Sequence, residues 1–312
     1  MKERWECIIV GGGAAGLSAA LVLGRARRRT LLVDGGEQSN RPAHGIGGLL
    51  GHDGRPPAEL YATGRRELAR YPTIDVRTGR VAGVAHGEGG FAATLATSAV
   101  ELTRRVILAT GMDYRLPDLP GLTQRWGRSV FHCPFCHGWE VRDRPLGVLD
   151  SDPTTRVHRA LLLTAWSADV TLLSNGPAGL TADDIDRLVA GGVDVDERRV
   201  AAVRGPGEEL STIVFDDGSE RACGGLLVAA VLHQRSDLAT QLGLALAPPN
   251  PIAADAVVIN PTGETNVAGA FVAGDAGTGM PSLANAVAAG SNAAAAVVRS
   301  LFVEEHATSL NR

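Results

Sequence analysis

The sequence is short of lysine and of aromatic residues. Lys2 is the only lysine, so arginine supplies the rest of the 30 basic residues, and aromatics make up 4% of the 312 residues. The net charge is −4, and neither a nucleic-acid surface nor a polybasic membrane patch is indicated. Chemistry on a small molecule is therefore expected. The arginines that end the first expected helix complement its dipole and need no partner; they are Arg25, Arg27, Arg28 and Arg29.

Cysteine is also scarce, and no signal peptide or membrane span stands out. Four cysteines are too few for a disulfide framework in a chain of this length. Met1–Glu6 carries charges where a signal peptide needs an apolar run. The alanine-rich stretch from Ala284 to Val298 is interrupted by polar residues, as in a packed helix rather than a membrane span. We therefore expect a cytoplasmic globular protein whose length favours two domains.

The N-terminal segment has the pattern of a nucleotide-binding βαβ unit. Cys7–Val10 predicts a buried strand, and the helix after it continues from Leu17 to Gly24. Between them stands Gly11-Gly12-Gly13-Ala14-Ala15-Gly16, which satisfies G-x-G-x-x-G. A second strand, Thr30–Val33, ends in Asp34, about twenty residues on, where a carboxylate can accept hydrogen bonds from ribose hydroxyls. Strand, turn, helix and acid together predict a dinucleotide site.

The glycines of this turn have separate roles. Gly11 permits the tight turn, Gly13 lets the backbone approach a pyrophosphate, and Gly16 lets the helix pack closely on the strand. The N-terminus of the helix, with Ala14 and Ala15, faces the phosphates.

A redox centre is predicted at His132-Cys133-Pro134-Phe135-Cys136-His137-Gly138-Trp139-Glu140. Two cysteines separated by two residues can close a strained, easily reduced disulfide. A c-type haem attachment signal would require export and would leave the glycine turn unexplained. Zinc is disfavoured because the two histidines and two cysteines are too close in sequence to surround one ion. Cys7 and Cys223 are expected to be buried within apolar strands, so no metal site is predicted.

Two later turns indicate the family. The strand from Arg105 ends in Ala109-Thr110-Gly111, and the strand from Gly269 ends in Gly274-Asp275. With these turns the chain resembles the low-molecular-weight thioredoxin reductases over nearly its whole length. The resemblance implies an α/β fold of two Rossmann-like three-layer nucleotide-binding domains, the second inserted in the first. Residues 1–115 and 241–312 would form the FAD-binding domain, and residues 116–240 the central redox domain.

The resemblance implies FAD as the cofactor and a homodimer as the assembly. Asp275 would hold the ribityl chain, and the helix capped by Ser282 would point its positive end at the flavin pyrimidine. The Arg-Gln pair usual at this turn in the family is missing. The implied FAD-binding residues are Gly11, Gly13, Ala14, Ala15, Gly16, Asp34, Asn40, Val81, Thr110, Gly111, Gly274, Asp275 and Ser282.

The second glycine-rich loop, which would bind NADPH in this family, is absent. After the expected strand Leu146–Leu149 the chain reads Asp150-Ser151-Asp152-Pro153. The two carboxylates oppose an anionic pyrophosphate, and the proline lacks an N–H. The family's paired arginines for the 2′-phosphate are replaced by Ser174-Asn175-Gly176-Pro177. The other elements of a second nucleotide domain are expected, but NADPH binding is not.

The resemblance implies that Cys136 faces the flavin and Cys133 meets the substrate. His137 stands where thioredoxin reductases carry an acidic proton donor, and either His137 or His132 could accept thiol protons. Both histidines could instead merely cap the helix. His44 and His52 are expected in a surface loop.

The combination of this dithiol with an erased NADPH site resembles the dithiol oxidases of gliotoxin and holomycin assembly. In these, the enzyme disulfide takes electrons from a small dithiol and passes them to FAD, and dioxygen becomes hydrogen peroxide. One alternative is a flavin-dependent reductase of a thioredoxin-like protein, fed by ferredoxin or through a divergent nicotinamide site. Another is a flavin-bound redox sensor. Since there is no nicotinamide to admit, we expect one dominant arrangement, with Cys133 and Cys136 at the isoalloxazine.

Overall fold

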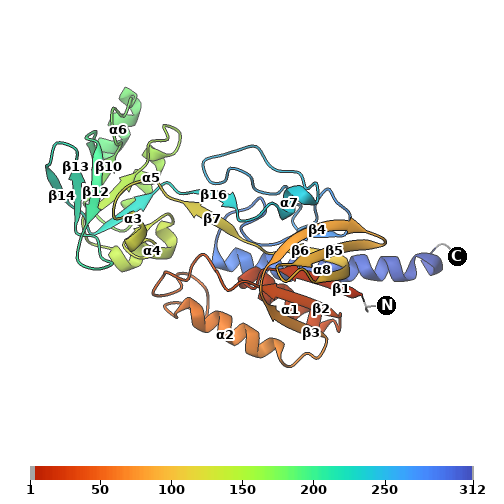
Figure 1. The fold of residues 1–312 in the computed structure, drawn as a ribbon. Coiled ribbons are helices and arrows are strands. Elements are labelled where there is room, and N and C mark those ends of the chain that lie inside the picture. Colours follow the sequence, from red (N-terminus) through yellow and green to blue (C-terminus); the bar gives the residue numbers. More distant parts are fainter. Residues whose placement is uncertain (1–3, 311–312) are drawn as a thin grey trace. The chain divides into compact units, whose positions relative to one another are not determined.

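The chain folds into two compact α/β units (Figure 1). The computed structural model describes residues 4–310. The first unit comprises the chain up to Ser39, Ala58–Asp113 and the chain from Leu232 onward, and the second comprises Asn40–Pro57 and Tyr114–Val231. The expected division placed residues 40–57 in the first unit, whereas in the structure they group with the second.

A seven-stranded sheet forms the first unit. Its order is β3-β2-β1-β6-β5-β4, and β17 pairs with the second half of β6. Strands β3, β2, β1, β6 and β17 are parallel, whereas β4, β5 and β6 form an antiparallel meander. The strands are β1 (Trp5–Val10), β2 (Thr30–Asp34), β3 (Ile74–Thr78), β4 (Val81–Gly87), β5 (Gly90–Leu95), β6 (Val100–Leu108) and β17 (Ala270–Val272). The helices are α1 (Ala14–Arg25), α2 (Pro57–Leu68), α7 (Leu238–Gln241) and α8 (Leu283–Leu310).

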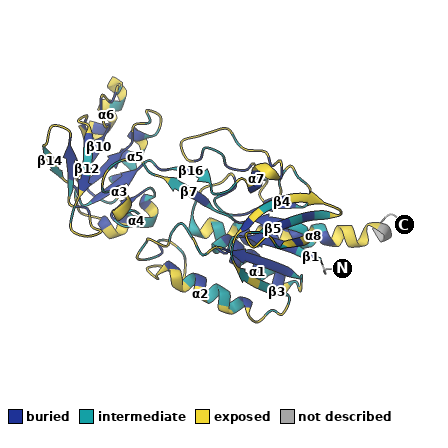
Figure 2. Ribbon diagram, in the orientation of Figure 1, coloured by how far each residue is buried: buried dark blue, intermediate teal, exposed yellow. Residues whose placement is uncertain are grey.

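Helix α8 packs on α1 through small side chains. Ala19 and Ala20 of α1 are fully buried in one core with Ala293 and Val297 of α8. Gly290 is required here, because a Cβ on it would lie 2.0 Å from the Ala15 carbonyl oxygen. By length and composition alone Leu283–Ala307 could cross a membrane, the one such stretch in the described chain. The face of α8 toward α1 is buried, whereas residues 302–307 of this helix are exposed (Figure 2).

The second unit contains a five-stranded parallel sheet, in the order β11-β10-β9-β15-β8, and a three-stranded antiparallel sheet, β12-β13-β14. The parallel strands are β8 (Val130–Phe131), β9 (Leu146–Leu149), β10 (Val170–Leu173), β11 (Val193–Asp196) and β15 (Gly225–Val228). The antiparallel strands are β12 (Val200–Arg204), β13 (Thr212–Phe215) and β14 (Glu220–Ala222). The helices are α3 (Leu122–Arg125), α4 (Pro134–Val141), α5 (Arg156–Leu163) and α6 (Ala182–Ala190). The chain passes between the units through β7 (Met112–Arg115) and β16 (Val231–Gln234), which pair with each other.

The expected α/β architecture of two Rossmann-like units is confirmed. The expected strand at Leu146–Leu149 has the predicted bounds. One detail is wrong: Cys223 is buried, but it lies in the connection between β14 and β15 rather than within a strand.

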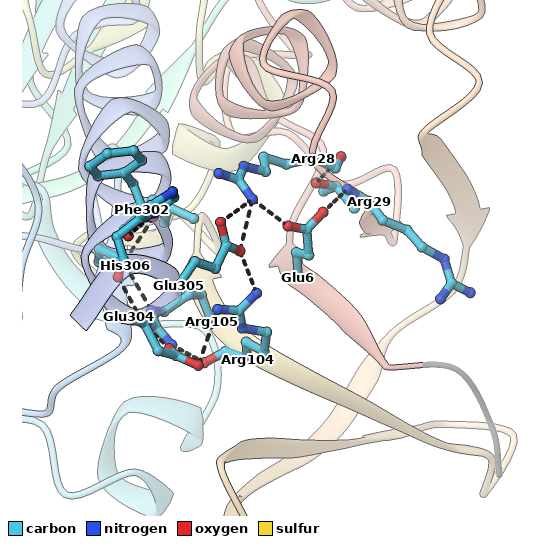
Figure 3. A network of polar contacts seen from close by, with 12 residues as sticks. Glu6, Arg28, Arg29, Arg104, Arg105, Phe302, Glu304, Glu305 and His306 are labelled. Carbon is cyan, nitrogen blue, oxygen red and sulfur yellow. Dashed lines mark hydrogen bonds and ion pairs between the residues drawn. The ribbon is translucent and has the colours of Figure 1, made fainter. Parts of the chain in front are cut away.

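The arginines that end α1 are not all without partners, contrary to expectation. The Arg28 guanidinium donates to Glu6 at 2.7 Å and to Glu305 at 3.0 Å. Glu305 also accepts from Arg104 at 2.7 Å, so one carboxylate near the end of α8 joins the start of β2 to β6 (Figure 3). Burial, which lowers the Arg28 pKa, is outweighed by its bonds to Glu6 and Glu305, and the pKa is raised.

We expect Glu305→Gln to lower the free energy of unfolding at pH 7 by about 1 kcal/mol, the upper range for a partly exposed ion pair. The Glu305 side chain is 32% exposed. Its pKa is held below the ordinary value, first by the hydrogen bond from Arg104. Its contribution is therefore present above the ordinary glutamate pKa and is lost as the pH falls through the lowered value. Urea unfolding at several pH values checks this. Glu88→Gln, at an exposed position in the same unit, should be neutral at every pH.

Candidate flavin and dithiol sites

The glycine turn after β1 has the shape of a phosphate cradle. Gly11 has φ +105°, and a Cβ on it would lie 2.2 Å from the Ala109 carbonyl oxygen. A Cβ on Gly16 would lie 1.8 Å from the Gly11 carbonyl oxygen, which explains the close fit of helix on strand. Beside Gly13, by contrast, the nearest atom to an added Cβ is Gln38 Cγ at 3.8 Å. No side chain caps α1 and no acid occupies its first turn, so the turn fits an anionic ligand.

Asp34 ends β2 and is buried beside this turn. Its Oδ1 accepts hydrogen bonds from the Gly12 N–H at 3.1 Å and the Gly36 N–H at 3.0 Å. Its Oδ2 is paired with the guanidinium of Arg65 on α2. A buried carboxylate held by backbone amides fits the ribose-binding acid of a dinucleotide fold.

The other expected flavin residues of the first unit follow neighbouring strand ends. Thr110 and Gly111 follow β6, and Gly274 and Asp275 follow β17, which is parallel to β6. Because β1, β2, β6 and β17 are parallel, these residues share one edge of the sheet with the glycine turn and Asp34. Ser282 caps α8, accepting a hydrogen bond from the Asn285 N–H at 3.1 Å.

Val81 and Asn40 take different places. Val81 is buried at the start of β4, two residues beyond Gly79, whose N–H donates to the Asp34 carbonyl at 2.9 Å. Asn40, six residues after Asp34 in the chain, groups with the second unit. Its assignment to FAD stays a prediction.

Cys133 and Cys136 are held by α4 in the second unit. Cys133 is the N-cap residue, Pro134 follows at the first helical position, and the Cys136 N–H donates to the Cys133 carbonyl at 3.2 Å. Proline suits that position because its φ is already helical and it needs no N–H partner. The two cysteines are in the dithiol state, and their Sγ atoms are 2.7 Å apart and hydrogen-bonded. The pair can therefore close into a disulfide with little backbone movement.

The Cys133 thiol is more acidic than an ordinary cysteine. Its pKa is lowered to about 7, first by the hydrogen bond from the Cys136 thiol, and also by the N–H groups of Cys136 and Phe135. Burial opposes this shift. By contrast, burial raises the pKa of Cys7 and of Cys223 well above the ordinary value. Only a thiolate is a strong nucleophile, so Cys133 is the reactive cysteine near neutral pH.

His137 lies on the same helix with one nitrogen fixed. Its Nε2 is 3.0 Å from the Gly127 carbonyl oxygen, and its ring stacks on Phe131 with centroids 5.8 Å apart. A carbonyl only accepts hydrogen bonds, so the neutral ring carries its proton on Nε2. Nδ1 is buried and has no hydrogen-bond partner within residues 4–310. Burial lowers the pKa of His137, although the charge of Glu140 opposes this.

His132 lies among aromatic side chains that the sequence analysis did not predict to be near it. Its ring centroid is 4.6 Å from that of Tyr114 and 5.6 Å from that of Trp126. Burial first, then the positive charges of His137 and Arg159, lowers its pKa to about 4. The two aromatics lie 18 and 6 residues before His132, so no local motif could have indicated them.

The loop of residues 40–57 is more than a surface loop. A Cβ on Gly47 would lie 2.4 Å from the Cys136 carbonyl oxygen, so this segment runs against the backbone of α4. The Arg128 Nε donates to the Pro42 carbonyl at 3.0 Å, which fixes the start of the loop. The glycines of this segment were the available signal, because glycine commonly marks a close backbone approach.

In the second unit, carboxylates occupy the loop after β9. Asp150 is buried, and its Oδ2 accepts from Thr155 Oγ1 and from Arg159, both at 2.7 Å. Its Oδ1 accepts from the Asp152 N–H at 2.9 Å. Asp152 in turn accepts from the Thr154 N–H at 2.8 Å. The loop's donors thus bind the protein's own carboxylates.

The segment after β10 is closed in a similar way. The buried Ser174 hydroxyl donates to the Gly176 carbonyl at 2.6 Å. Asn175 Oδ1 accepts from the Val200 N–H at 2.8 Å. No positive side chain stands within residues 174–177, where the family places the arginines for a 2′-phosphate.

A family match over most of the chain shows which family it belongs to. The model of the pyridine nucleotide-disulphide oxidoreductase family matches residues 5–290, so the chain belongs to that family. It is a flavin disulfide oxidoreductase of the thioredoxin reductase type, and the family implies FAD.

Individual relatives agree with this assignment. Thioredoxin reductase tcpT of Claviceps purpurea is 33% identical over 294 residues, covering 91% of this chain and 90% of that protein. The crystal structure of an oxidoreductase from Agrobacterium tumefaciens is 39% identical, with a TM-score of 0.90, covering 96% of this chain and 99% of that one. The crystal structure of HlmI is 35% identical, with a TM-score of 0.91, covering 100% and 96% of the two chains. The resemblance to thioredoxin reductases is confirmed.

We expect alkylation of the reduced protein to be confined to the α4 cysteines and to rise through about pH 7 at Cys133, following its thiolate fraction. Pulse labelling with iodoacetamide, read by peptide mass spectrometry, measures this. In Cys136→Ser, a hydroxyl replaces the thiol donor, so the midpoint for Cys133 should move. An unchanged midpoint would show that the Cys136 thiol does not set this pKa. Cys7, buried in β1, is the internal control and should stay unlabelled.

Proposed function

We propose that this protein oxidises a small-molecule dithiol to a disulfide, with dioxygen as the electron acceptor and hydrogen peroxide as the product. The net reaction removes two electrons and two protons from the substrate dithiol and transfers them to one dioxygen. The observation that carries the proposal is the Asp150 loop, because it occupies the place of a nicotinamide-binding loop with a buried carboxylate. A complete dithiol thus stands in a chain whose loop after β9 binds its own carboxylates, which supports a reaction without NADPH.

Two properties of the cysteines suit thiol exchange. When Cys133 and Cys136 form a disulfide, a substrate thiolate can attack Cys133, and the second substrate thiol then releases it as the enzyme dithiol forms. The low pKa of Cys133 makes it a good leaving group in that exchange. Bound FAD would take the electron pair from the enzyme dithiol and deliver it to dioxygen.

His137 is the better base of the two candidates. Thiol oxidation releases protons, and Nδ1 of both histidines is buried without a hydrogen-bond partner among the described residues, but His137 also has its Nε2 anchored on the Gly127 carbonyl. His132 has a pKa of about 4, too low for a base that works near neutral pH. We therefore assign proton acceptance to His137 and a packing role to His132.

NADPH is excluded from this proposal on electrostatic grounds. A nicotinamide dinucleotide brings a pyrophosphate, which would meet Asp150 and Asp152 where a glycine-rich loop offers N–H groups. Arg159 forms an ion pair with Asp150 at 2.7 Å, so its charge is already used by that carboxylate rather than by a phosphate. The family resemblance supports a homodimer as a further part of the proposal.

A disulfide reductase is the second candidate, favoured by the names of the relatives. The name of the family includes pyridine nucleotides, and the relative tcpT is named a thioredoxin reductase. A reductase of this chain would need a donor other than NADPH, such as ferredoxin, or a nicotinamide site elsewhere.

Anaerobic mixing of the purified flavoprotein separates these functions. We expect a small dithiol such as dithiothreitol to bleach the flavin, and NADPH and NADH not to. Admission of air should restore the oxidised spectrum and yield one hydrogen peroxide for each dithiol oxidised. Cys136→Ser should keep its FAD but lose bleaching by the dithiol. Bleaching by a nicotinamide would establish the reductase, and no bleaching by either donor would leave a redox sensor.

His137→Ala should slow flavin reduction by the dithiol about a hundredfold near pH 7, as for a lost general base. Raising the pH should restore the rate, because substrate thiols then ionise without help. Stopped-flow bleaching across a pH series measures both effects. His132→Phe, which keeps an aromatic ring beside Tyr114 and Trp126, should react at nearly the wild-type rate. The reverse ranking of the two variants would reassign the base.

A further inference from the structure

The ribose-binding acid of the first unit has an unexpected partner. Asp34 Oδ1 is occupied by two backbone amides, those of Gly12 and Gly36. Gln38 Nε2 lies 3.4 Å from both carboxylate oxygens. Oδ2 also holds the guanidinium of Arg65, from α2, and is the oxygen on which a ribose hydroxyl would join these side-chain donors.

Arg65 has hydrogen-bonding capacity to spare. A guanidinium carries five N–H donors, and in the described chain Arg65 uses one nitrogen, toward Asp34. Its side chain is 39% exposed, whereas that of Asp34 is 9% exposed. The unused donors can therefore be reached by a ligand at Asp34.

The glycine turn itself supplies no positive side chain. Gly11–Gly16 contains only glycine and alanine, so its attraction for a pyrophosphate rests on amides and the helix dipole. Arg65 is joined to that turn through two successive contacts, Arg65 to Asp34 and Asp34 to the Gly12 N–H. Its position on α2 is fixed, because Gly64 next to it lies against α1: a Cβ there would be 3.0 Å from Leu17 Cδ1.

We propose that Arg65 is a binding residue for the adenosine monophosphate half of FAD. It orients Asp34 Oδ2 for the ribose hydroxyls and offers its unused N–H donors and its charge to the same half of the cofactor. This assignment does not depend on the substrate or on the electron acceptor of the enzyme.

Titration of flavin-free protein with FAD, followed by flavin fluorescence, tests the assignment. Arg65→Gln should weaken FAD binding about tenfold, the effect of losing one charge-assisted contact of about 1.4 kcal/mol. Arg66→Gln is the matched control: Arg66 is the exposed neighbour on the same helix, bonded to Thr63 Oγ1 at 2.8 Å, and its loss should leave FAD affinity unchanged. FMN, which lacks the adenosine half, should bind wild type and Arg65→Gln equally.

The double variant Arg65→Gln with Asp34→Asn shows whether the two residues act together. We expect it to weaken FAD binding by less than the product of the single effects. Arg65→Lys keeps the charge without the fork and should fall between wild type and Arg65→Gln. Far-ultraviolet circular dichroism of each flavin-free variant verifies folding. Unchanged or tighter FAD binding by Arg65→Gln, or equal losses in Arg65→Gln and Arg66→Gln, would overturn the proposal.

Discussion

The first unit depends on one constraint, the close approach of α1 to backbone on two sides. Gly16 brings the helix against the turn after β1, and Gly290 brings α8 against Ala15. Any larger residue at either place would push the first turn of α1 away from the sheet edge where the strands end. The glycine turn is thus held in place because Gly16 and Gly290 have no side chains. The alanine-rich faces of α1 and α8 allow the two helices to pack closely.

The second unit has the same kind of architecture but no glycine-rich turn after its corresponding strand, β9. There the loop contains the buried Asp150 carboxylate, which accepts hydrogen bonds from Thr155 and Arg159. The loop is therefore stabilised by the unit's own side chains, and its donors are satisfied by the Asp150 carboxylate.

Much of this was predictable from sequence, for a local reason. The turn after β1, the acid at Asp34 and the dithiol at the start of α4 depend on residues close together in the chain, so pattern and spacing sufficed. The surroundings of the two histidines could not be predicted from the sequence, because Tyr114, Trp126 and the Gly127 carbonyl contact them through tertiary packing. The same holds for Arg28: its charge was read as a helix-end feature, whereas its partner Glu305 is 277 residues away.

The grouping of residues 40–57 with the second unit changes how the two units are tied together. The chain passes from one unit to the other after Ser39, Pro57, Asp113 and Val231. The units therefore share four covalent tethers, where a simple insertion would have two. The first tether begins only five residues after Asp34. The chain therefore runs directly from the segment that carries Asp34 into the loop whose Gly47 lies against the Cys136 backbone.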